Sequence, residues 1–504
     1  KMINRRRLLG STAAMLCLAA VNPVAAQTGG AQSLLEAARQ LRQNAYVRNT
    51  TPLPAPFADL DYDAFRGIRP IAGVSAMVPN GPDFAFDLLP PGLYFPDPVR
   101  VDQVTPDGLQ EIILTPDLFS YEPRYFDDIP AESPGAGFSG MRLRYPLNTP
   151  DNMDEVLVIQ GASYFRAIGQ SMVYGLSARS VAIGTGGPVA EEFPGFKHLR
   201  LHQAADKSVR IEGLIDSPSL TAHIEMVLHP GTDTVLDITA TMLPRDDIDT
   251  IGIAPLTSMY LKGPLQSAVA DDFRPHVHDS EVLFIENGAG ERIWRPIVNP
   301  ARVETSVFMD SAPKSFGLYQ TSRAYENFQD TEARYHDRPS ARVTPTGDWG
   351  TGSVMLVEIP TADEFLDNIV TFWRPQDPLQ AGSEHRFSYQ LTWTRRAPDT
   401  NGLAQILQSR SGREHDQPGY RRFVIDFDTT QDKANAVLSA PEDVDVKGIS
   451  TFPLPDGKGT RVTFLIGPGE RDVADIRLSL RAEDETPLSP VWIYRWTRAR
   501  DGGV

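Results

Sequence analysis

Short runs in which apolar and polar residues alternate recur along the chain, and this pattern constrains the fold more than any other feature. Residues 222–226, 387–393 and 476–480 each place apolar side chains on one face of a strand. The 42 prolines and 39 glycines fall between such runs, where antiparallel strands would turn. The sequence therefore predicts a mainly β protein.

Two helices are expected beside the strands. In residues 31–46, apolar side chains recur at helical spacing, and we expect this helix to pack on the edge of a β-sandwich. Residues 361–368 are expected to form a short helix capped by Thr361. That helix would place Glu364 and Asp367 on one face.

The first 26 residues have the pattern of an export signal. Three arginines, Arg5 to Arg7, precede a short apolar run, and Val24-Ala25-Ala26 offers a cleavage site. The paired arginines favour the twin-arginine route over the Sec route. Cys17, the only cysteine, lies inside this segment, so we expect no disulfide and no cysteine-ligated metal in the exported chain.

The charge balance limits the class of ligand. The formal net charge is −17, and it falls to about −21 when the four cations of the leader, Lys1 and Arg5 to Arg7, are removed. An acidic chain of this kind is not expected to bind nucleic acid or anionic lipid. It suits a neutral ligand such as a sugar, which is held by hydrogen bonds and aromatic faces.

The length after the leader predicts two cores. We expect a large β-sandwich domain over residues 27–394, a polar linker over 395–420, and a second domain over 421–504. Strand runs in this last segment are spaced as in an immunoglobulin-like sandwich. No phosphate-binding loop, dinucleotide-binding fingerprint or Gly-x-Ser-x-Gly elbow is present, so a nucleotide-sugar-dependent synthase is not supported.

Four motifs carry a resemblance to a known family. They are residues 161–179, 251–259, 274–280 and 364–373, of which the first is too rich in Gly, Ser, Tyr and Arg to be explained by packing alone. With these motifs the chain resembles the periplasmic glucan biosynthesis proteins of the OpgG/OpgD (MdoG/MdoD) type. The resemblance implies a mutarotase-like N-terminal β-sandwich and a smaller immunoglobulin-like C-terminal domain.

The resemblance also selects a catalytic pair among the 65 acidic residues. Without the resemblance, Asp279 would be interpreted as a residue that caps a turn and Asp367 as an exposed residue of a helix. By motif they match the essential acids of relatives that act on β-1,2-glucan, with Glu364 as an acidic accessory. The family reaction is described as inverting, which needs one acid and one base. We favour Asp279 as the acid and Asp367 as a base acting through a relay, and the reverse assignment stays open.

Further side chains are candidates for sugar binding. Tyr335 and Arg338 rank highest, because the segment that carries them interrupts the apolar alternation with polar and aromatic groups. The other candidates are Tyr164, Arg166, Arg179, His278, Trp349 and Trp373. For the two tryptophans, a core position is the default interpretation. His276 and His278 would share a strand face, but no third ligand is evident, so neither a metal nor a cofactor is expected.

Three functions follow as expectations. The first is an endo-β-1,2-glucanase of osmoregulated periplasmic glucan biosynthesis, exported to the periplasm and acting on a linear polysaccharide. The second is an inverting transglycosylase that forms a cyclic β-1,2-glucan with one α-linkage. The third is a non-catalytic scaffold that binds glucan between a membrane synthase and modifying enzymes. The resemblance also implies a homodimer.

Overall fold

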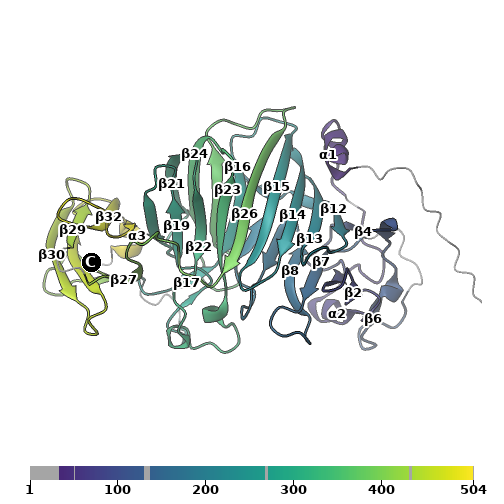
Figure 1. The fold of residues 1–504 in the computed structure, drawn as a ribbon, viewed down its shortest axis with the longest axis horizontal. Coiled ribbons are helices and arrows are strands. Elements are labelled where there is room, and N and C mark those ends of the chain that lie inside the picture. Colours follow the sequence, from purple (N-terminus) through teal and green to yellow (C-terminus); the bar gives the residue numbers. More distant parts are fainter. Residues whose placement is uncertain (1–32, 50, 130–136, 267–270, 431–433, 503–504) are drawn as a thin grey trace, which may run out of the picture. The chain divides into compact units, whose positions relative to one another are not determined.

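Two large sheets pack face to face around the main core, and the alternating runs 222–226, 387–393 and 476–480 all lie in the larger one (Figure 1). In the run 222–226, Ala222, Ile224 and Met226 point into that core, as their spacing predicts. The computed structural model describes residues 33–49, 51–129, 137–266, 271–430 and 434–502. The prediction of a mainly β protein is confirmed. The expected leader and Cys17 lie outside the described residues.

The first sheet has fourteen strands. In spatial order they are β29 (Asn435–Ser439), β32 (Val473–Arg481), β33 (Val491–Thr497), β20 (Arg292–Pro296), β19 (Val282–Glu286), β22 (Ser315–Tyr319), β23 (Ser340–Thr346), β26 (His385–Thr394), β15 (Thr234–Pro244), β14 (Leu220–His229), β13 (Val209–Asp216), β12 (Gly195–His202), β4 (Arg100–Thr105) and β5 (Gly108–Ile112). The pairs β12–β4 and β20–β33 are parallel, and the other neighbours are antiparallel.

The second sheet has eleven strands. They are β2 (Val78–Pro79), β3 (Ala85–Leu89), β7 (Gly140–Tyr145), β8 (Asp154–Gln160), β9 (Tyr164–Ala167), β10 (Ser177–Arg179), β16 (Ile251–Ser258), β25 (Ile369–Pro375), β24 (Thr351–Glu358) and β21 (Glu304–Ser311), with β11 (Val181–Ile183) also paired to β16.

Shorter elements connect and cover these sheets. Two strand pairs stand apart, β1 (Ile68–Pro70) with β6 (Phe119–Tyr121), and β17 (Tyr260–Lys262) with β18 (Val277–His278). The helical elements are α1 (Leu34–Arg42), α2 (Tyr62–Arg66), α3 (Arg498–Asp501), η1 (Pro116–Leu118), η2 (Tyr325–Asn327) and η3 (Tyr335–Asp337). None of the helices among the described residues is long and apolar enough to cross a membrane.

Helix α1 is shorter than the expected 31–46 and lies elsewhere than expected. Ala38 is fully buried and packs with Leu214 and Leu243, so the helix covers the face of β13, β14 and β15 and not the sandwich edge. The Thr221 hydroxyl donates a 2.9 Å hydrogen bond to the Ala38 carbonyl. The apolar stripe of this helix therefore finds its partner on a sheet face.

The helix expected over 361–368 does not form. The amide side chain of Asn299 bonds both the N–H and the carbonyl of Thr361, and Asn368 bonds the backbone of Tyr260 and Ile359. These side-chain bonds to the backbone compete with helical hydrogen bonds. The segment 361–368 is thus a loop that these side-chain hydrogen bonds hold in place. The prediction that Glu364 and Asp367 share a helical face is wrong.

The C-terminal strands build a second core. A four-stranded sheet of β27 (Ile406–Arg413), β28 (Arg421–Phe427), β31 (Thr460–Gly467) and β30 (Asp445–Pro453) packs with β32 and β33 around Phe423, Trp492 and Trp496. The segment expected as a linker, 395–420, contains strand β27, so it is not a linker over 406–413. Strand β33 pairs with β20, and the fourteen-stranded sheet thereby continues into this part of the chain.

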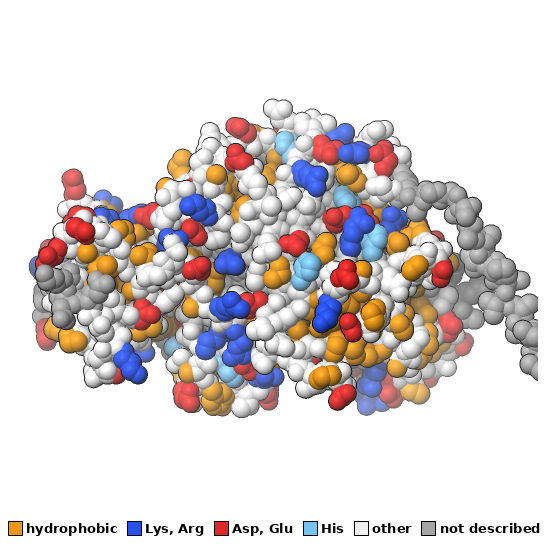
Figure 2. Space-filling model, in the orientation of Figure 1, with side chains coloured by type: hydrophobic (Ala, Val, Ile, Leu, Met, Phe, Trp, Pro, Cys, Tyr) orange, Lys and Arg blue, Asp and Glu red, His pale blue; other side chains and the backbone are white. Residues whose placement is uncertain are grey.

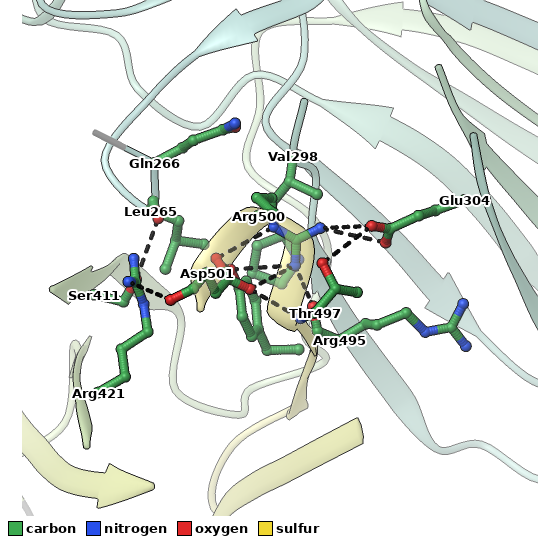
Figure 3. A network of polar contacts seen from close by, with 12 residues as sticks. Leu265, Gln266, Val298, Glu304, Ser411, Arg421, Arg495, Thr497, Arg500 and Asp501 are labelled. Carbon is green, nitrogen blue, oxygen red and sulfur yellow. Dashed lines mark hydrogen bonds and ion pairs between the residues drawn. The ribbon is translucent and has the colours of Figure 1, made fainter. Parts of the chain in front are cut away.

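A buried ion network secures this junction (Figure 3). Arg500 lies 3.2 Å from Glu304 at the edge strand β21 and 2.9 Å from Asp501. Asp501 also accepts hydrogen bonds from the Tyr494 hydroxyl and the Thr497 N–H. Arg500 and Asp501 are almost wholly buried. Removing one ion would leave the others charged in a site that excludes water.

We expect Arg500→Met to lower the free energy of unfolding by about 3–5 kcal/mol, because Glu304 and Asp501 would lose their buried counter-charge. Urea denaturation followed by tryptophan fluorescence measures this loss. The matched control is Arg471→Met, which breaks an exposed pair with Asp443 and should leave the free energy of unfolding almost unchanged. Equal losses for the two variants would contradict a structural role for the network.

Candidate functional site

Asp279 is a buried carboxylate directly after strand β18. Its backbone N–H donates to the Met259 carbonyl at 2.8 Å, which fixes the strand end, and the residue is only 4% exposed. One carboxylate oxygen accepts a 2.6 Å hydrogen bond from the Arg338 guanidinium. Burial raises the pKa of Asp279, the positive charge of Arg338 opposes this, and the negative charge of Asp367 adds to it. The two acids predicted from the sequence therefore interact electrostatically.

Arg338 belongs to a chain of contacts that leads to Glu364. The guanidinium lies 4.3 Å from the centroid of the Tyr335 ring, and the Tyr335 hydroxyl donates to Glu364. Burial and this hydrogen bond raise the pKa of Tyr335, which keeps the phenol protonated. Arg274 also binds Glu364 at 2.6 Å. Glu364 thus anchors the 361–368 loop and is not a free carboxylate.

Asp367 stands on the same loop but faces open space. Its side chain is 37% exposed, and its nearest cation is Arg166 of β9, 3.6 Å away. It lines a hollow of about 800 Å³, the central hollow. Other residues of this wall are Tyr94, Phe95, Arg142, Glu155, Tyr164, Arg166 and Tyr174. Asp367 is therefore one of two acids, with Glu155, that a ligand in the central hollow would contact.

Two further hollows continue the central one. The Arg334 hollow, of about 800 Å³, shares Glu155 and Tyr174 with it and is also lined by Arg395. The Tyr46 hollow, of about 320 Å³, shares Tyr94, Phe95, Gly161 and Ala162 with it. Because neighbouring hollows have walls in common, we describe the three together as the groove, with Asp367 in its middle part.

The loop of Tyr174 packs against the segment of Arg338, the partner of Asp279. A Cβ atom placed on Gly175 would lie 2.9 Å from Cβ of Arg338, so only a glycine lets the two loops approach this closely. The Val173 N–H donates to the Asp337 carbonyl at 3.3 Å. Arg338 therefore packs directly behind the wall that the central and Arg334 hollows share, with Asp279 bonded to it. Asp279 itself lines none of the three hollows and is separated from them by Arg338.

Several predicted site residues lie away from the groove surface. Trp373 is fully buried and Trp349 is 6% exposed in the core, so we withdraw both as ligand contacts. Their burial follows the default expected for tryptophan in a β-rich chain. Arg179 is also buried, where it pairs with Glu191 at 2.5 Å and lies 4.8 Å from the centroid of the Tyr164 ring. It supports Tyr164 from behind.

His278 is fully buried and cannot contact a ligand in the groove. Its ring stacks on Tyr260 with 5.2 Å between centroids, and burial lowers its pKa to about 4. The ring is therefore neutral at neutral pH, and His278 packs the strand that positions Asp279. Within the described ranges, no three His, Cys, Asp or Glu side chains are grouped to hold a metal ion.

Sequence reasoning missed the residues that shape the groove. Tyr174 was present in the first motif but was not singled out, and Tyr94 lies in a turn without any motif. Glu155, Arg334 and Arg395 line the groove from three separate loops and strands. Only the high aromatic and glycine content of residues 161–179 signalled such a surface.

Comparisons with known proteins agree on one family. The family model described as "Periplasmic glucan biosynthesis protein, MdoG" matches residues 30–496. A protein of Vibrio cholerae called "Glucans biosynthesis protein G" is 40% identical, over 92% of this chain and 86% of its own length. Proteins with the same name from Rhodopseudomonas palustris and Shewanella frigidimarina are 37% and 36% identical, over 98% and 92% of this chain and 100% and 84% of their own lengths. The chain therefore belongs to the MdoG family of periplasmic glucan biosynthesis proteins.

Proposed function

We propose that this protein cleaves the backbone of a β-1,2-glucan in the periplasm through Asp367 and Asp279. The glucan class rests on the family and on the names of its members, and the β-1,2 linkage rests on the resemblance of the four motifs. The observation that carries the proposal is a pair of carboxylates. Asp367 lies in the wall of a long groove, and its negative charge contributes to the raised pKa of a second, buried carboxylate, Asp279. Glycosidic hydrolysis requires such a pair.

The geometry of the groove favours one division of roles. A general acid must come within hydrogen-bond reach of the glycosidic oxygen. Asp367 lines the central hollow, and Asp279 lies behind Arg338, so Asp367 is the proton donor in this proposal. This reverses the assignment that we favoured from the sequence. The leaving sugar takes its proton from Asp367 as the bond to the anomeric carbon breaks.

Asp279 then serves as the base. Burial raises the pKa of Asp279, which makes its carboxylate a stronger base, and the charge and hydrogen bond of Arg338 favour the ionised form that a base needs. Water attacks the anomeric carbon, and its proton passes to Asp279 through an intervening hydroxyl or water. Because neither step joins the sugar to the protein, the configuration inverts. The transglycosylase alternative differs only in the acceptor, a sugar hydroxyl in place of water.

We expect Asp367→Asn and Asp279→Asn each to reduce cleavage of linear β-1,2-glucan by at least about 100-fold, because the amide neither donates nor accepts the proton in transfer. Mass spectrometry of the products measures this loss. Shorter reducing chains indicate hydrolysis, and products lighter by one water indicate cyclisation.

The matched control is Asp363→Asn on the same loop. Asp363 is exposed, and its side chain accepts a 2.9 Å hydrogen bond from the Phe365 N–H, which asparagine can also accept. This variant should turn over glucan at the rate of the unmodified protein. Unchanged glucan with every protein, including the unmodified one, would favour the binding-scaffold alternative.

Arg338→Met should move the acidic limb of the kcat/KM profile to higher pH. The charge of Arg338 lowers the pKa of Asp279, so its removal raises that pKa, and the base then loses its ionised form at a higher pH. Rates measured across the pH range test this shift, and Arg338→Lys should restore part of it. An acidic limb that stays in place in an active Arg338→Met variant would contradict the role of Asp279 as base.

A further inference from the structure

The turn that carries Tyr94 stands between two of the hollows of the groove. Tyr94 and Phe95 line both the central hollow and the Tyr46 hollow. Tyr94 is nevertheless 75% exposed, which is unusual for an aromatic ring at the junction of two cavities. In Figure 2, hydrophobic side chains gather over the region where α2, β7 and β8 lie in Figure 1. A single exposed tyrosine is common on protein surfaces. Whether Tyr94 contacts a ligand therefore has to be argued from the turn that carries it and from the two hollows beside it.

The backbone of this turn is rigid. Gly92 and Phe95 exchange two hydrogen bonds, of 3.0 and 2.9 Å, which close a two-residue turn with Leu93 and Tyr94 at its tip. Gly92 has a φ of +120°, and a Cβ there would lie 2.8 Å from the Leu60 side chain. The turn therefore packs closely against the segment that contains Leu60.

The same turn holds a strained residue. Leu93 has a φ of +52°, in the left-handed region that a leucine rarely adopts. Phe95 holds the other side of the turn, because its ring lies 6.2 Å from that of Phe65 and 3.0 Å from the position of a Cβ on Gly161. Strain of this kind persists where the surroundings impose it and is concentrated at ligand sites. The backbone of the turn thus places Tyr94 at its exposed tip, beside the two hollows.

We infer that Tyr94 is a stacking platform for a glucosyl ring, over which the glucan chain passes from the central hollow into the Tyr46 hollow. The inference rests on the proposed function for the identity of the ligand. The apolar face of a pyranose ring can stack on the face of an aromatic side chain that is open to solvent, as Tyr94 is. The hollow beyond Tyr94 is lined by groups of both signs, among them Lys197 and Asp216, which suits a neutral polyhydroxylated chain.

This placement gives the platform a role in chain-length preference. Asp367 lies in the wall of the central hollow, so a ring on Tyr94 sits at the end of that hollow, away from the Arg334 hollow. Short oligosaccharides can fill the central hollow without crossing the turn. Longer chains gain the contact with Tyr94, and their affinity should depend on the ring.

The test measures binding, because binding does not require turnover. In the Asp367→Asn background, calorimetry with linear β-1,2-glucans of graded length should show about tenfold weaker binding of long chains after Tyr94→Ala, which removes the stacking face. Tyr94→Phe keeps the ring and should bind as before. Tyr62→Ala, which removes another exposed tyrosine that lines none of the three hollows, should change nothing. Short chains should lose little affinity with any of these variants.

The outcomes separate this inference from the proposed function. Unchanged binding of long chains by Tyr94→Ala, or an equal loss with Tyr94→Phe, would overturn the platform. If long chains bind as predicted but no protein cleaves them, the proposed reaction fails and the platform stands. Absence of any glucan binding, in a protein whose unfolding transition is normal, would overturn both.

Discussion

The buried ion pair between Asp279 and Arg338 is the contact on which the rest of the candidate site depends. A carboxylate that is 4% exposed would be costly without a counter-charge, and the guanidinium at 2.6 Å supplies it. Arg338 is held in turn by the Tyr335 ring, and Tyr335 by Glu364. One ion pair thus links the end of strand β18, the turn η3 and the loop that carries Asp367. These three segments are far apart in the sequence, and their polar contacts support one wall of the groove from behind.

Buried arginine–carboxylate ion pairs also lie at the junction with the C-terminal strands. There Arg500 neutralises Glu304 and Asp501, and strand β33 adds to β20. Strand β20 pairs with β19, which begins three residues after Asp279. The C-terminal part of the chain therefore supports the sheet that leads into the site. In both places of this acidic protein, an arginine neutralises carboxylates that are buried away from water.

The sequence predicted the strands better than the site. Alternation at Ala222, Ile224 and Met226 has a direct physical cause, since one strand face meets the core, and local residues suffice to recognise it. The loop 361–368 misled the prediction, because its shape is set by Asn299 and Arg274, which are distant in the sequence. Motif resemblance selected Asp279 and Asp367 as a catalytic pair, which stays a prediction; the negative charge of Asp367 contributes to the raised pKa of Asp279. The resemblance could not find Tyr94, whose position depends on a turn and on two hollows that exist only in the folded chain.

In the proposed reaction, water attacks the sugar directly, with Asp367 as acid and Asp279 as a distant base. The most direct test is NMR spectroscopy of the first reducing ends released from linear β-1,2-glucan, before mutarotation mixes the anomers. Direct attack by water on a β-linked sugar inverts the anomeric carbon, so we expect the α-anomer to appear first. First appearance of the β-anomer would mean a covalent sugar intermediate and would contradict direct attack by water.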